Sequence, residues 1–93
     1  MKDDLQTLRK EIDRVDERLV PLILERMEIS RRIADVKREN GLPIHNAERE
    51  KDILERIRQK VGNEWGKYTC EIYRKIFEMS REYQKERLNS HGD

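Results

Sequence analysis

Apolar residues recur at helical spacing from Leu5 to Val36 in a chain of only 93 residues. They form two lines of a heptad register: Leu5, Ile12, Leu19 and Ile33, and Leu8, Val15, Leu22, Ile29 and Val36. A helix over residues 3–39 is about 55 Å long, whereas a compact globule of this chain length has a radius of gyration of about 12 Å. The remaining chain is too short to cover such a helix. We therefore expect an intertwined homodimer in which two long helices cover each other.

Breaks in this pattern predict two further helices, and so an all-α chain with one long, one short and one medium helix. Asn40-Gly41 and Pro43 end the long helix, and the segment from Gly62 to Gly66 separates the other two. The predicted helices span residues 3–39, 47–60 and 67–88 of a single domain, 1–93, with a frayed tail at 89–93.

Pro21 lies inside the long helix, where a proline removes a backbone hydrogen bond. The heptad register continues on both sides of it, so we expect one kinked helix. The alternative is a helix that ends at Pro21 and folds back into a four-helix bundle.

Composition argues against several classes of protein. Charged residues make up 44% of the chain but the net charge is only +1, which favours neither a disordered chain nor a nucleic-acid binder. No apolar run approaches the roughly 18 residues of a membrane span, and we find no secretory signal. His45 and His91 lie too far apart to suggest a metal site, and the single Cys70 favours a reducing compartment. We expect a cytoplasmic protein that binds no metal, membrane or nucleic acid.

Polar residues interrupt the apolar faces of all three predicted helices. Arg26 takes a heptad core position, where a charge removed from water costs several kcal/mol unless it is paired. The other intrusions are Lys37 in the first helix, Arg49 and Glu50 in the second, and Ser80 and Gln84 in the third. Each alone has an ordinary explanation, such as a snorkelling arginine or an edge residue. Together they predict a buried, positively charged pocket for a small dianion with hydroxyl or ether oxygens.

No pair of nucleophile and base accompanies this pocket, because neither Cys70 nor Ser80 has a histidine at a plausible spacing. An enzyme built on it would therefore work by orienting its substrate and by fixed electrostatics rather than by covalent chemistry.

The order of these residues resembles that in the all-helical (AroQ-type) chorismate mutases over about residues 5–88. The matching positions are Leu8-Arg9-Lys10-Glu11-Ile12-Asp13, Val15-Asp16, Leu19, Leu22, Glu25-Arg26, Ile33-Ala34, Lys37, Pro43-Ile44, Glu48-Arg49-Glu50, Ile57 and Ser80-Arg81-Glu82-Tyr83-Gln84. The resemblance implies a homodimer of three-helix chains with two equivalent sites, each enclosed by both subunits. It also implies an isomerase of the shikimate pathway, which converts chorismate to prephenate for the biosynthesis of phenylalanine and tyrosine.

The resemblance also implies a role for each polar residue. Arg9 would reach into the partner's site, while Arg26, helped by Arg49 and Ser80, would hold the two carboxylates of chorismate. Lys37 and Gln84 would donate to the ether oxygen, and Glu50 would take the hydroxyl. Asn46 stands where the family often has an aspartate, and it could bind the hydroxyl or cap the second helix.

Two alternatives to the mutase stay open. One is an isochorismate pyruvate lyase on the same fold, which would use a similar cationic pocket. The other is a helical dimerisation module without catalysis, in which Arg26 sets the register. The presence of Ser80 and Gln84 favours the enzyme, because a register device needs only one polar core residue.

Overall fold

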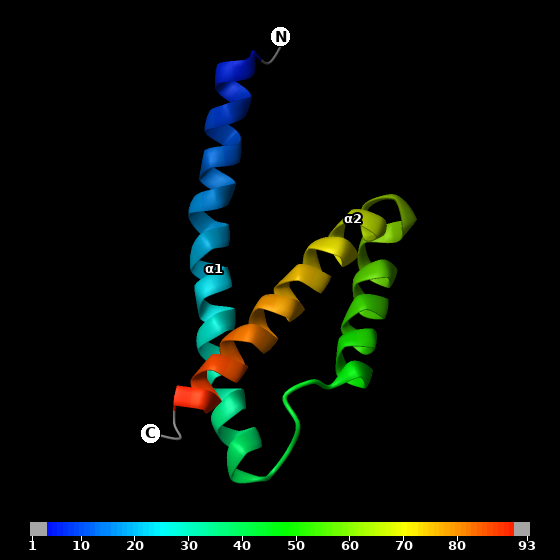
Figure 1. Cartoon of the computed structure of the whole chain (residues 1–93). Helices are drawn as coiled ribbons and strands as arrows, with labels where there is room; N and C mark the ends of the chain where they lie inside the picture. Colours follow the sequence, from blue (N-terminus) through cyan, green and yellow to red (C-terminus); the bar gives the residue numbers. More distant parts are fainter. Residues whose placement is uncertain (1–3, 91–93) are drawn as a thin grey trace.

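The computed structural model describes residues 4–90, and within them the chain forms two helices and no strand. Helix α1 spans Leu5–Glu39 and helix α2 spans Ala47–Ser90, joined by residues 40–46 (Figure 1). Asp4 caps α1 by accepting a hydrogen bond from the backbone N–H of Thr7 at 2.7 Å. The predicted all-α class is therefore confirmed. Within the described residues no helix has the length and apolarity to cross a membrane.

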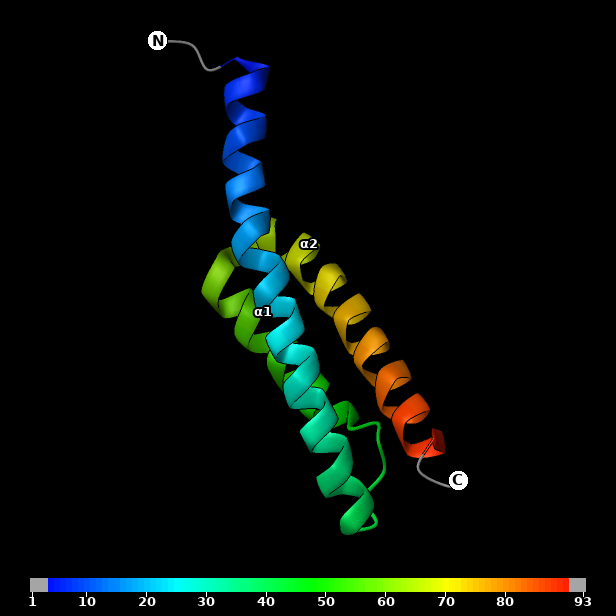
Figure 2. The ribbon, with the colours of Figure 1, turned by 90° about the vertical axis from the view of Figure 1, so that its left-hand side faces the viewer.

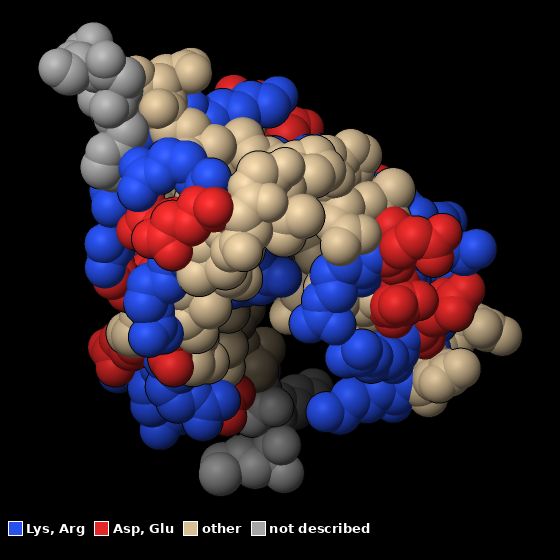
Figure 3. All heavy atoms as spheres, turned by 90° about the horizontal axis from the view of Figure 1, so that it is seen from below, with Lys and Arg blue, Asp and Glu red and all other residues tan. Residues whose placement is uncertain are grey.

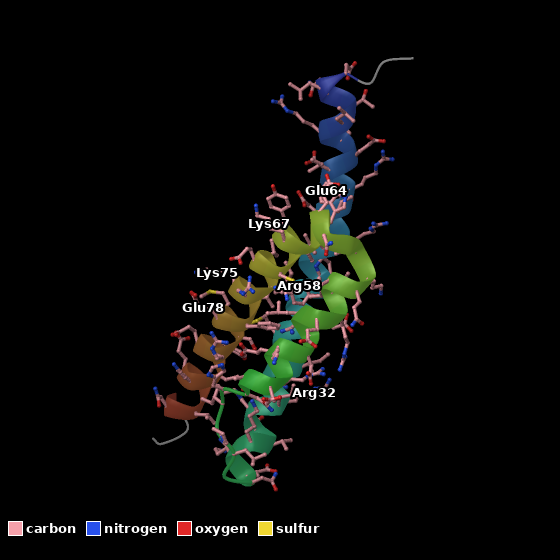
Figure 4. The ribbon with its side chains drawn as sticks, turned by 90° about the vertical axis from the view of Figure 1, so that its right-hand side faces the viewer. Arg32, Arg58, Glu64, Lys67, Lys75 and Glu78 are labelled. Carbon is pink, nitrogen blue, oxygen red and sulfur yellow. The ribbon has the colours of Figure 1, made fainter. Side chains whose placement is uncertain are left out.

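The structure has two helices where the sequence predicts three, because the predicted second and third helices meet at a kink inside α2 with no loop between them. Within Ala47–Ser90 only Gly62 has non-helical dihedrals, with φ 82° and ψ 175°, and it turns the chain sharply. A single glycine can make this turn, so the predicted break at 62–66 shrinks to one residue. We call residues 47–61 the first arm of α2 and residues 63–90 the second arm. Glu64 and Lys67 lie near the bend (Figure 4).

The predicted helix limits need two further adjustments. Helix α2 continues through residues 89–90, where the sequence predicts fraying. The rest of that predicted tail, residues 91–93, and the predicted helix start at residue 3 lie outside the described residues.

Helix α1 runs without interruption through Pro21, so the predicted single helix is confirmed and the four-helix bundle is wrong. Figure 2 shows that α1 changes direction part-way along, in the light-blue stretch of its ribbon, as expected of a helix containing proline.

The second arm of α2 crosses the later half of α1, and the small core lies at this crossing (Figures 1 and 2). Its buried apolar residues are Ala34, Cys70 and Phe77. At the end of the crossing, Arg87 holds Asp35 through two hydrogen bonds of 3.1 and 3.3 Å. This contact fixes the second arm against α1.

The first half of α1 extends beyond α2 and leaves its apolar seam uncovered (Figures 1 and 2). Leu5, Ile12 and Leu22 are exposed by 61%, 63% and 59%. The radius of gyration is 17.1 Å, well above the value of about 12 Å for a compact chain of this length. A single copy therefore leaves an apolar surface that soluble monomers rarely expose.

We predict that Gly62→Ala lowers the free energy of unfolding by about 1–3 kcal/mol, because its dihedrals lie in a region that only glycine adopts readily. An added Cβ meets nothing within 4 Å, so the cost is conformational rather than steric. Urea unfolding followed by circular dichroism, at one protein concentration, measures the change.

Gly66→Ala is the matched control, since Gly66 lies in the helix just beyond the bend. Its added Cβ would lie 3.5 Å from Arg58 Cα, an ordinary van der Waals contact. Alanine also favours a helix over glycine, so we expect no loss of stability. Equal losses from both substitutions would contradict the assigned role of Gly62.

We predict that the ion pair between Asp35 and Arg87 makes the free energy of unfolding depend on pH in the acid range. The hydrogen bond from Arg87 lowers the pKa of the Asp35 carboxyl below its ordinary value of 3.8. A lowered pKa means that the stabilisation is present above 3.8 and is lost as the pH falls through the lowered value. Asp35→Asn should therefore reduce the urea midpoint at pH 7, and its difference from the wild type should shrink below pH 3.8. A difference that is constant with pH would show that packing, not charge, is responsible.

Candidate active site

A cavity of about 270 Å³ lies between the later half of α1 and both arms of α2. Six of the eight residues predicted for the site line it: Arg26, Lys37, Asn46, Arg49, Glu50 and Ser80. Ile29, Ile33, Ile53 and Phe77 form its apolar wall. The fold thus brings together residues that are as many as 54 positions apart in the sequence.

Arg26 lies half-buried at the wall that the second arm provides. Its guanidinium carbon is 5.7 Å from the ring centroids of both Tyr73 and Phe77, and the two rings contact each other edge to face. Aromatic rings attract a cation without neutralising it. No carboxylate among the described residues pairs with Arg26, so its charge remains available to an anion.

The other charged residues leave the cavity strongly positive. Lys37 Nζ donates to the backbone carbonyl of Ile44 at 2.5 Å, and neither Lys37 nor Arg49 has a carboxylate partner in the described part of the chain. Arg81, also in the wall, donates to Glu50 Oε2 at 2.5 Å. Four cations and one carboxylate give an excess of three positive charges. Figure 3 shows Lys and Arg side chains gathered on the right-hand side of a central hollow. Such a lining favours an anion.

Ser80, Gln84 and Ser30 form a buried hydrogen-bonded chain at the cavity. The hydroxyls of Ser30 and Ser80 are 2.8 Å apart, and Gln84 Nε2 donates to Ser80 Oγ at 3.2 Å. Gln84 lies behind Ser80 rather than in the cavity wall, and its Oε1 is buried without a hydrogen-bond partner. A buried polar atom left unpaired is costly, and a catalytic role is one explanation for such an atom in a native protein.

Asn46 caps the first arm of α2, because its Oδ1 accepts a hydrogen bond from the backbone N–H of Arg49 at 3.1 Å. It also lines the cavity, so capping and contact with a ligand are compatible. Arg9 lies on the exposed first half of α1 and does not line the cavity of its own chain.

The family is settled by comparison with known proteins. Residues 8–85 match the family described as Chorismate mutase type II. The chain belongs to the chorismate mutase type II family. The resemblance seen in the sequence is thereby confirmed.

Two kinds of relative match this sequence. It is 34% identical over 90 residues to the chorismate mutase of Methanocaldococcus jannaschii, covering 95% of this chain and 91% of that protein. It is 47% identical over 55 residues to the bifunctional chorismate mutase/prephenate dehydratase of Aquifex aeolicus, covering 59% of this chain but 15% of that protein. The corresponding bifunctional protein of Buchnera aphidicola subsp. Schizaphis graminum is 36% identical over 90 residues, which is 23% of its length. No solved structure is a significant match to this chain.

Sequence reasoning missed two polar residues of the cavity wall, Ser30 and Arg81. Ser30 follows Arg26 by four positions, so the spacing of one helical face could have indicated it. Arg81 stands beside Ser80 in an ordinary charged stretch, and only the fold reveals that it meets Glu50. The described residues contain no group of three acidic, histidine or cysteine side chains that could hold a metal.

Proposed function

We propose that this chain is a chorismate mutase, an isomerase that rearranges chorismate to prephenate in the biosynthesis of phenylalanine and tyrosine. The excess of three positive charges around a cavity of about 270 Å³ supports this most directly. Chorismate is a small dianion, so its two carboxylates suit such a cavity. Membership of the family over residues 8–85 supports the same reaction. We assign the enzyme to the cytoplasm, where a reducing environment protects the free thiol of Cys70.

The reaction is intramolecular: the ether C–O bond breaks while a C–C bond forms in the same molecule, and no atom leaves. The enzyme has to select the compact diaxial conformer and stabilise the charge that separates in the transition state. Cations fixed near the ether oxygen can contribute several kcal/mol, because they need no reorganisation during the reaction. Neither a nucleophile nor a cofactor is required.

The two carboxylates of chorismate are assigned to Arg26 and Arg49, with help from Ser80. Both arginines lack a carboxylate partner among the described residues, so binding the substrate breaks no ion pair in this chain. The aromatic contacts of Arg26 hold its guanidinium in place before the substrate arrives, which lowers the entropy cost of binding.

The ether oxygen is assigned to Lys37 and Gln84, and the hydroxyl to Glu50. Lys37 uses one N–H on Ile44, which leaves two more for a substrate. The Gln84 amide has a second N–H beyond the one on Ser80. Because Gln84 lies behind Ser80 and not in the cavity wall, its side chain has to turn toward the cavity to reach the ether oxygen. Glu50 Oε1 accepts no hydrogen bond within residues 4–90, so it can accept one from the hydroxyl.

The enzyme acts as a homodimer, in our proposal, because α1 needs a second copy to cover its seam. An apolar groove of about 340 Å³ lies beside α1, lined by Ile23, Met27, Ile72, Ile76 and Met79 with the stems of Arg26 and Lys75. The exposed leucines and isoleucines of a partner's α1 offer matching apolar surface. Such an arrangement would carry Arg9 of one subunit toward the cavity of the other.

We predict that the purified protein consumes chorismate, with saturable kinetics and prephenate as the product, without added metal or cofactor. The loss of chorismate's ultraviolet absorbance measures the rate, and chromatography identifies the product. A folded dimer that leaves chorismate intact but releases pyruvate from isochorismate would overturn the mutase in favour of the lyase. A folded dimer inactive on both would favour the structural module.

Arg26→Ala and Arg32→Ala provide a matched pair for this assay. Both residues lie on α1, but Arg32 is exposed and does not line the cavity. We expect Arg26→Ala to lose at least about 100-fold in kcat/KM while remaining folded, and Arg32→Ala to retain wild-type activity. A large loss of stability in Arg26→Ala with an unchanged rate would contradict its assigned role.

We predict that mixing an Arg9→Ala chain with an Arg49→Ala chain restores activity that neither has alone. If each site takes Arg9 from one subunit and Arg49 from the other, a hybrid dimer has one intact site. Random subunit exchange should then recover about a quarter of wild-type activity. Exchange must be verified by native mass spectrometry, and exchanged but inactive mixtures would rule out a shared site.

A further inference from the structure

Glu50 is placed in the cavity by a contact between the two arms of α2. Its Oε2 accepts a hydrogen bond from Arg81 Nη1 at 2.5 Å, and the two residues are 31 positions apart. Both side chains are mostly shielded, with 23% of Glu50 and 27% of Arg81 exposed. His45 Nε2 lies 3.6 Å from Oε1, which is beyond hydrogen-bond distance. Arg81 is therefore the residue that fixes the direction of the carboxylate.

The same pair separates two hollows of the molecule. A second hollow, of about 570 Å³, lies between the two arms and includes Arg58 and Glu78 in its lining, which Figure 4 labels. Glu50, Phe77 and Arg81 line both this hollow and the 270 Å³ cavity. They form the partition between the two spaces.

We infer that Arg81 is a positioning residue of the site, which acts on the substrate through Glu50. This inference rests on the proposed mutase function. A carboxylate in a cavity that receives a dianion would repel the substrate if its charge were not balanced. Arg81 balances that charge at Oε2 and leaves Oε1 to accept the substrate hydroxyl.

This role differs from that of the other cations in the cavity. Arg26, Lys37 and Arg49 have no carboxylate partner within the described residues and can bind the substrate directly. Arg81 is committed to Glu50, so its removal leaves an unpaired carboxylate facing the dianion. The loss should appear chiefly in binding, because the repulsion acts on the ground state and the transition state alike.

The test uses Arg81→Met, which keeps much of the side-chain length but removes the charge. We expect KM to rise about tenfold, with kcat within about threefold of wild type. Arg81→Lys restores a cation and should return KM to within about threefold. Calorimetry measures the affinity for prephenate, which should weaken about tenfold in Arg81→Met relative to the wild type. Adding Arg81→Met to the Glu50→Gln variant should weaken it by less than about twofold, since a neutral amide needs no balancing charge.

Arg87→Met is the matched control. Arg87 has the same exposure, 27%, and likewise joins distant segments by pairing with a part-buried carboxylate, but it does not line the cavity. It should lower stability as much as Arg81→Met, or more, without changing KM. Unfolding in urea checks both variants.

The outcomes separate this inference from the proposed function. A wild type that neither turns over chorismate nor binds prephenate overturns the mutase, and the inference fails with it. An active wild type with an unchanged KM in Arg81→Met overturns only the inference. An undiminished effect of Arg81→Met in the Glu50→Gln background also overturns it, because Arg81 would then act on the substrate directly. An equal rise of KM in Arg87→Met would assign the effect to general loosening of the fold.

Discussion

A helix of 35 residues that its own chain cannot cover is the constraint on which the rest of this structure depends. The later half of α1 packs against the second arm of α2, while its first half extends beyond the fold (Figure 1). Burial of apolar surface is the main source of stability in small domains, and among the described residues only Ala34, Cys70 and Phe77 form the buried apolar core. In the proposed homodimer a second copy buries the exposed apolar seam of α1, so the stability of the fold depends on dimer formation.

Helix α1 also carries polar residues that line the cavity. Its heptad register places Arg26 among apolar positions, and Ser30 and Lys37 follow on the face that meets α2. Each polar residue on that face weakens apolar packing, which the aromatic contacts of Arg26 offset only in part. A cavity lined in this way is poor as a core and well suited to an anion. Natural proteins commonly lose stability at their functional sites in this manner.

The sequence predicted the long helix, the all-α class and the family, because these depend on local periodicity and on the order of polar residues. It also named six residues that the fold gathers around one cavity. It failed where the outcome depends on a single backbone conformation or on distant contacts. The turn at Gly62 occupies one residue rather than five, since a positive φ at glycine needs no loop. The contact of Arg81 with Glu50 crosses two arms of α2, and no local pattern encodes it.

In the proposed site, Glu50 is a carboxylate that would face an anionic substrate. A dianionic substrate with a hydroxyl needs an acceptor for that hydroxyl, and a carboxylate is a strong acceptor, yet its charge opposes binding. Pairing one oxygen with Arg81 resolves the conflict, because the other oxygen keeps its capacity to accept while the net charge of the pair is zero. The arginine lies on the partition between two hollows rather than among the unpaired cations. Its position therefore suits it to orient the carboxylate. Arg26, Lys37 and Arg49 have no carboxylate partner within residues 4–90, and in this proposal they attract the substrate.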